Sequence, residues 1–208
     1  MATDKTVLIA APNFQTAVFL IRGTAPYVQN KFSQKAREMM RLTQEGGSTR
    51  KKGAKRDAKN FKETYEQAKH IASDGWIGIP APSFRNAMIS ACRVVGFKMT
   101  VAKLSVFIEP DGFDADDGTP LVRILSGEPR VHEGLVRNST GVADIRWRPM
   151  WESWSAQLRV KFDADQFTLQ DVTNLLSRSG IQVGVGEGRP DSKASAGMGW
   201  GTFEIVNS

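Results

Sequence analysis

GVGEGRPDSKASAGMGWG, residues 184–201, decides the fold because it separates a helical pattern from the last strand pattern of the sequence. Its six glycines form two spaced triplets: Gly184, Gly186 and Gly188, then Gly197, Gly199 and Gly201. Glycine lacks Cβ, so such a loop adopts positive φ and lets another chain or a phosphate approach the backbone. Arg189 and Lys193 lie between the triplets. Exposed N–H groups beside cations suit an anionic backbone.

Phosphate-binding loops of the Walker and Rossmann types follow a strand and open a helix, whereas this loop follows a helix and opens a strand. Both types are therefore excluded. An ordinary surface connection between two core elements explains the glycines equally well.

Strand and helix patterns alternate upstream of the loop. Apolar runs and apolar alternation predict strands at 15–23, 104–110, 121–125, 131–136, 154–162 and 202–206. Helical spacing predicts helices at 28–42, 61–73, 84–95, with Ser83 as N-cap, and 168–179, which Gly180 ends.

Without residues 25–80 the order reads strand, helix, strands, strand, helix, strand. This order predicts an α+β fold with a ferredoxin-like (RRM-like) βαββαβ core and an extra strand pair. We expect one domain over residues 1–208. Residues 25–80 then form a helical insertion that carries a basic loop at 46–62.

The composition is that of one globular domain, with 208 residues of which 40% are apolar. The single cysteine, Cys92, excludes an internal disulfide and is interpreted as a core residue. We see neither a signal-peptide pattern nor an apolar run of membrane-spanning length. The sequence therefore predicts a cytoplasmic protein that makes no membrane contact.

The formal charge of +6 comes from one segment, residues 50–62. That segment has one acid, Asp57, and seven bases: Arg50, Lys51, Lys52, Lys55, Arg56, Lys59 and Lys62. The remaining residues sum to zero. Positive charge concentrated on a loop favours contact with nucleic-acid phosphates. The alternative is a solvated loop that serves solubility.

The stretch from Leu175 to Val206, with GVGEGRP and GMGWGTFEIV at its centre, resembles the RAMP superfamily of CRISPR-associated RNA-binding proteins. VRNSTGVADIRWRPMWESW, residues 136–154, resembles uncharacterised tailed-phage proteins related to that superfamily. The resemblance implies a ferredoxin-like domain and RNA binding. The superfamily includes guide-RNA backbone subunits and guide-processing endoribonucleases.

In that superfamily the glycine-rich loop lies against bound RNA. The resemblance therefore implies a contact role for Gly186, Arg189, Gly197 and Gly199. The long spacer at 190–196 departs from the usual pattern, which leaves RNA and a protein neighbour as alternative partners of the loop.

Arg146 and Arg148 alternate with apolar residues, so an extended strand places both guanidiniums on one face. Two guanidiniums on one face can bind phosphates. Alternatively, Asp144 and Glu152 pair with them in a structural network. The neighbouring tryptophans, Trp147, Trp151 and Trp154, either stack on bases or anchor a core, and we favour the core.

Few residues of the sequence indicate catalysis. His132 beside Glu133 is a weak candidate for a general base in RNA cleavage, and a satisfied surface histidine is the simpler interpretation. The aspartates at 111–117 lack the ligand order of an EF-hand, so we interpret them as a solvated turn. We expect no metal and no cofactor.

The sequence predicts a non-enzymatic subunit that binds RNA or single-stranded DNA and assembles side by side with copies of itself. One alternative is a phage structural or interaction protein, such as an inhibitor of a host defence complex, that contacts proteins in the host cytoplasm. The other is a metal-independent endoribonuclease.

Overall fold

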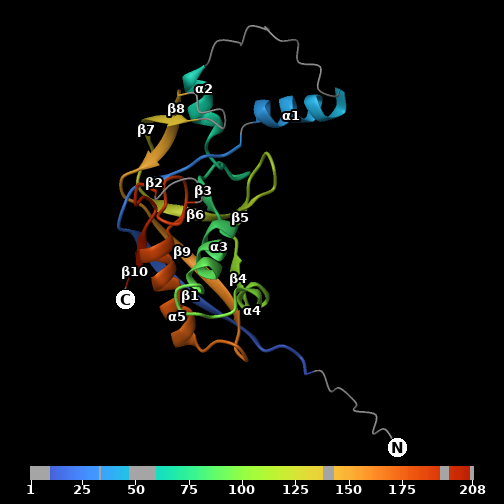
Figure 1. Ribbon diagram of the computed structural model, residues 1–208, viewed down its shortest axis with the longest axis vertical. Helices are drawn as coiled ribbons and strands as arrows, with labels where there is room; N and C mark the ends of the chain where they lie inside the picture. The colour runs from blue at the N-terminus through green and yellow to red at the C-terminus, as the bar shows by residue number, and fades with distance from the viewer. Residues whose placement is uncertain (1–9, 33, 47–59, 138–142, 193–196, 207–208) are drawn as a thin grey trace, which may run out of the picture.

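A computed structural model describes residues 10–32, 34–46, 60–137, 143–192 and 197–206. The chain has a mixed α+β fold with antiparallel strands in two sheets (Figure 1). The α+β class predicted from the sequence is therefore confirmed. None of the helices in these ranges combines the length and the apolarity needed to cross a bilayer.

The larger sheet is built around β1 (Phe14–Gly23), which pairs with β10 (Phe203–Ile205) on one side and β9 (Ser155–Asp163) on the other. The far edge of β9 is shared by two strands, β4 (Val106–Glu109) and β6 (Pro120–Ser126). All these pairs are antiparallel. Two short strands, β3 (Gly78–Pro80) and β5 (Gly112–Phe113), extend the sheet beyond β6.

Alternation along β1 separates the two faces of this sheet. Phe19 and Ile21 are buried, whereas Val18 and Leu20 are 56% and 45% exposed. Helices α3 (Ala81–Ala91) and α5 (Leu169–Arg178) cover the buried face, as Figure 1 shows. Their side chains join those of the strands in the hydrophobic core, which includes Phe84, Leu158, Leu176 and Phe203.

The smaller sheet has the order β2-β8-β7. Its strands are β2 (Tyr27–Val28), β7 (Arg130–Arg137) and β8 (Ala143–Trp151). Helix α2 (Phe61–Gln67) packs on β8, where the rings of Phe61 and Trp147 lie 5.5 Å apart. The predicted insertion at 25–80 thus supplies α1 (Gln34–Gly46) and α2, and it also supplies strands to both sheets.

Several predicted boundaries are wrong; the helix predicted at 61–73, for example, ends at Gln67. The helix predicted from residue 28 begins only at Gln34, because Tyr27 and Val28 pair with β8. The strand predicted from residue 104 begins at Val106, after helix α4 (Met99–Ser105). Helix α3 begins two residues before Ser83, with proline at its start, so Ser83 lies in the first turn and is no N-cap.

Gly180 does not end the last helix. Helix α5 continues as a π-helical turn, η1 (Ser179–Val183), and the chain turns at Gly184. A Cβ on Gly180 would lie 2.1 Å from the carbonyl oxygen of Phe203. This glycine therefore allows the helix to pack directly on β10.

Candidate functional site

The glycine-rich loop, residues 184–201, joins η1 to β10 and lies against the N-terminal part of the chain. All six glycines of its two triplets have positive φ, between 66° and 81°. The conformation predicted from the sequence is confirmed. The amides of Met198 and Trp200 both donate to the carbonyl of Gly188, at 2.7 and 3.2 Å. The two ends of the loop are therefore held together by backbone hydrogen bonds.

Two glycines of the loop have different surroundings. A Cβ on Gly186 would lie 2.6 Å from the carbonyl oxygen of Val28, whereas a Cβ on Gly199 would meet nothing within 4 Å. At Gly197 the nearest atom would be the carbonyl oxygen of Arg189, at 2.2 Å. The backbone that approaches Gly186 and Gly197 closely thus belongs to this chain. Gly199 keeps open space for another molecule.

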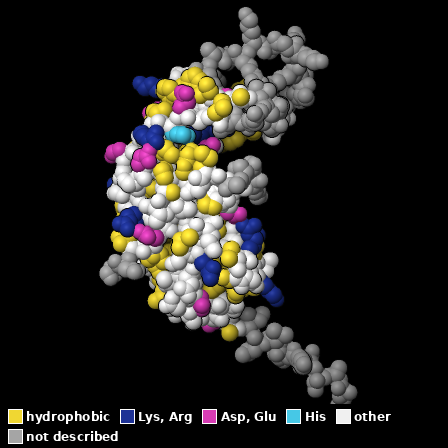
Figure 2. Space-filling view, turned by 60° about the vertical axis from the view of Figure 1, so that its left-hand side comes forward, with side chains coloured by type: hydrophobic (Ala, Val, Ile, Leu, Met, Phe, Trp, Pro, Cys, Tyr) yellow, Lys and Arg dark blue, Asp and Glu magenta, His cyan; other side chains and the backbone are white. Residues whose placement is uncertain are grey.

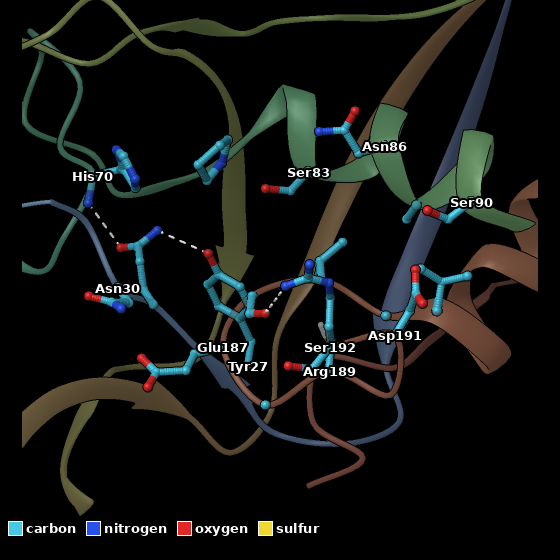
Figure 3. A pocket seen from close by; sticks show the side chains of 18 residues that line it. Tyr27, Asn30, His70, Ser83, Asn86, Ser90, Glu187, Arg189, Asp191 and Ser192 are labelled. Carbon is cyan, nitrogen blue, oxygen red and sulfur yellow. Dashed lines mark hydrogen bonds between the residues drawn. The ribbon is translucent and has the colours of Figure 1, made fainter. Parts of the chain in front are cut away.

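A cavity of about 390 Å³ lies between the loop and helix α3. Figure 3 shows one wall formed by Ser83, Asn86 and Ser90, which project from α3. The glycine-rich loop forms the facing wall. His70 and Asn30 lie at one end of the cavity, and Asp191 lies at the other.

The loop wall offers unused hydrogen-bond donors. The backbone N–H groups of Gly186, Gly188 and Arg189, which all line the cavity, donate to no atom of the described residues. The Arg189 guanidinium donates to the Gly186 carbonyl at 3.1 Å and forms no salt bridge within the described part of the chain. Amides without a partner among the described residues, beside a guanidinium whose acidic neighbour Asp191 is held by Arg93, can bind an anion.

The acids of the loop are already neutralised. Arg93 of the turn after α3 lies 2.7 Å from the Asp191 carboxylate, and this hydrogen bond holds the pKa of Asp191 below its ordinary value. Glu187 pairs with Arg148 of β8 at 3.0 Å. Neither acid is therefore an unpaired negative charge in the cavity wall.

The hairpin of β7 and β8 lies against the loop. His132 and Arg148 are directly opposite each other in the two strands, which places them on one face. The His132 ring packs edge-on against Trp200 at 5.1 Å. The hairpin therefore contacts the loop through His132 and Trp200 as well as through the ion pair of Arg148 and Glu187.

The arginine face predicted for this stretch is formed on β8, and its arginines are paired. Arg146 lies 3.1 Å from Asp144, as the alternative of a structural network predicted. Arg148 is 7% exposed and uses Glu187, a partner that the sequence did not indicate. Glu152 pairs instead with Arg130.

Two of the three tryptophans near β8 belong to the core. Trp151 and Trp154 are 1% and 0% exposed, so the core interpretation is confirmed for both. Trp147 packs on Phe61 and donates its indole N–H to Glu133 at 2.8 Å.

A buried ionic cluster joins the insertion to the turn between β4 and β6. Lys31 Nζ lies 2.6 Å from Asp114 Oδ1 and 2.8 Å from Asp116 Oδ2. The other oxygen of Asp114 lies 2.8 Å from His70 Nδ1. Asp114 is 3% exposed, so the prediction of a solvated acidic turn is wrong for this residue.

The pKa values of the cluster follow from these contacts. Burial alone raises the pKa of Asp114, but the hydrogen bond from Lys31 brings it below its ordinary value. Burial lowers the pKa of His70. His70, Asp114 and Asp117 offer ligand atoms within 4.8 Å of one another, yet the Lys31 ammonium already supplies the positive charge that Asp114 needs. The contacts therefore describe a structural ion cluster.

Other predicted contact residues cannot be located. Arg50, Lys51, Lys52, Lys55, Arg56, Lys59 and Lys193 lie outside the described residues. Conversely, sequence reasoning missed Asn30, Ser83 and Asn86 as cavity residues. No local pattern marks them, because the cavity forms only when three distant segments meet.

No known protein family matches this chain, and no curated protein is similar to it.

Proposed function

We propose that the protein binds single-stranded nucleic acid, RNA in the first place, without cutting it. The observation that carries the proposal is the loop wall of the cavity, with three amides that donate to no atom of the described residues and the Arg189 guanidinium. Such groups bind phosphate oxygens. They serve any sequence, because phosphates are the same at every nucleotide.

The strand order supports a ferredoxin-like core. In the larger sheet β10, β1 and β9 are neighbours, and β4 and β6 follow on the far edge of β9. Taken with α3 and α5 on one face, this order fits βαββαβ with its second strand split in two. The position of the glycine-rich loop between α5 and the last strand agrees with the RAMP-like domain suggested by the sequence.

The charge of the chain supports an accessory role for the basic segment at 50–62. On the face in Figure 2, basic and acidic side chains are interspersed. Because the formal charges outside residues 50–62 sum to zero, long-range attraction of phosphates depends on the basic segment. That segment leads into α2, which packs on the hairpin through Phe61 and Trp147. The hairpin in turn contacts the glycine-rich loop.

Side-by-side assembly of copies of the protein along a nucleic-acid strand belongs to the same proposal.

A protein-binding role is the second candidate, favoured by Val18 and Leu20, which are exposed on the open face of the larger sheet. Exposed apolar side chains such as these can contribute to a protein contact.

Fluorescence anisotropy with labelled 20-nucleotide RNA, DNA and duplex probes tests the proposal at several salt concentrations. We expect salt-sensitive binding of the single strands, with the probes intact on a gel in the presence of a chelator.

Changing Lys51, Lys52 and Lys55 to Gln should weaken binding. It should also reduce the slope of log affinity against log salt concentration by about 0.7 for each lost phosphate contact. The control changes Lys103 and Lys161, far from the loop, in the same way. Absence of binding at low salt would overturn the proposal, and cleavage that depends on His132 would replace it with the endoribonuclease.

A further inference from the structure

The cavity between the glycine-rich loop and α3 has more polar groups than phosphate binding requires. We infer that it holds one adenine nucleotide, with the phosphate at the loop wall and the base at the end formed by Asn30 and His70. This inference rests on the proposed function and assigns a base preference to the same site.

The shape of the cavity agrees with a nucleotide. Figure 3 shows polar side chains along its whole length, from His70 and Asn30 to Asp191. A volume of about 390 Å³ falls within the range of small-molecule sites. A site for an isolated ion would need only the loop wall. The additional length therefore indicates a ligand that continues beyond its phosphate.

The end near His70 offers groups that recognise a base edge. The carboxamide of Asn30 and the hydroxyl of Ser83 form no hydrogen bond to the described residues. A carboxamide donates and accepts side by side, which is the complement of N7 and the N6 amino group of adenine. Asn30 is solvent-exposed at the cavity, so it can reach a ligand without losing an internal contact.

His70 adds an acceptor at the same end. Asp114 accepts the proton on Nδ1 of the ring, so the neutral imidazole has Nε2 as an acceptor. Burial lowers the pKa of His70, which favours this neutral form. Lys31 faces the same Asp114 carboxylate, and Asp117 lies beside it. An acceptor nitrogen suits the amino group of adenine.

The acidic groups of the loop wall are already paired with arginines. Glu187 and Asp191 are the acids that line the cavity, and each is neutralised by an arginine. Arg189 has no carboxylate partner among the described residues. The phosphate of a nucleotide therefore meets a wall with net positive charge.

The test separates base recognition from phosphate binding. Anisotropy is measured with a 20-nucleotide uridine oligomer and with the same oligomer carrying adenosine at three positions, in competition with AMP, GMP, CMP and UMP. The wild-type protein should prefer the adenosine-containing oligomer about tenfold, and AMP should compete best. Asn30→Ala should abolish this preference. Arg189→Gln should lower the affinity for both oligomers by the same factor.

Asn174→Ala, the same change on α5 outside this cavity, is the control and should alter neither value. Equal affinities for both oligomers, unchanged by Asn30→Ala, would overturn the inference and leave the proposed function in place. No binding of either oligomer, together with AMP binding that requires Asn30, would support the nucleotide pocket and overturn strand binding. Preference for another base that requires Asn30 would overturn the assignment of adenine.

Discussion

Arg148 of β8 places its guanidinium Nε 3.0 Å from Glu187 Oε2, and so joins the β7–β8 hairpin to the glycine-rich loop. The Arg148 side chain is 9% exposed and that of Glu187 is 29% exposed. The ion pair is therefore largely shielded from water on the arginine side. This contact, together with that of His132 and Trp200, fixes the relative position of two parts of the proposed site that are 39 residues apart in the sequence.

Removing one partner of this pair should destabilise the protein. Arg148→Leu leaves Glu187 without its cation, and we expect the free energy of unfolding to fall by about 1–3 kcal/mol, less than for a fully buried pair. The double change Arg148→Leu with Glu187→Leu should recover part of this loss. Urea denaturation measures all three proteins.

The pair of Arg146 and Asp144 is the matched control, because its side chains are 33% and 31% exposed. Arg146→Leu should change the free energy of unfolding by less than about 1 kcal/mol. Equal losses for Arg146→Leu and Arg148→Leu would contradict the structural role of Arg148.

The two glycines of the loop that the sequence treats alike should respond differently to alanine. Gly186→Ala forces a Cβ to within 2.6 Å of the Val28 carbonyl oxygen and adds the strain of positive φ, so we expect a loss of about 2–4 kcal/mol. Gly199→Ala adds only the strain of positive φ, so we expect the free energy of unfolding to fall by about 1 kcal/mol. Thermal and urea unfolding measure the difference, and a larger loss at Gly199 would be inconsistent with this packing.

The buried cluster around Asp114 should be more sensitive than any surface ion pair. Lys31→Met leaves a carboxylate whose side chain is 0% exposed without its ammonium partner, and we expect a loss of about 3–5 kcal/mol. Arg37→Met removes the partner of Asp117 nearby and should have an effect below about 1 kcal/mol, because the Arg37 side chain is 35% exposed. Similar unfolding midpoints in urea for these two variants would show that the cluster is not stabilising.

The sequence predicted those features of the fold whose signal lies within one short segment. β1 and β9 were predicted because their signals are local: an apolar run over residues 18–21 in β1, and the alternation of Leu158 and Val160 in β9. The positive φ of the loop glycines was also predictable, since it follows from residue type. The pair of Lys31 and Asp114 was not, because its partners are 83 residues apart and neither has a local signal.

The cavity was missed for the same reason. Ser83 was interpreted as a helix cap because serine before an apolar run usually caps a helix. The proline at the start of α3 moves the helix start upstream, which leaves the hydroxyl of Ser83 facing the cavity. A single-sequence pattern cannot show that Asn30 lies opposite the loop, because the chain between them forms most of both sheets.

As the pH falls, the protonation of His70 should destabilise the protein before the carboxylates of the protein are protonated. Burial lowers the pKa of His70 below its ordinary value of 6.5, so the unfolded chain binds this proton more readily than the folded protein. The free energy of unfolding should therefore be independent of this group well above pH 6.5 and fall as the pH drops below it. Asp114 has its pKa below the ordinary 3.8, so its contribution is lost only in stronger acid.

Urea denaturation at pH values from 7.5 to 4.5, a range that spans the ordinary histidine pKa, measures how the free energy of unfolding changes with pH. His70→Gln should flatten this pH dependence, and His132→Gln, which leaves the cluster intact, should retain it. A slope that survives His70→Gln would assign the acid sensitivity to another group.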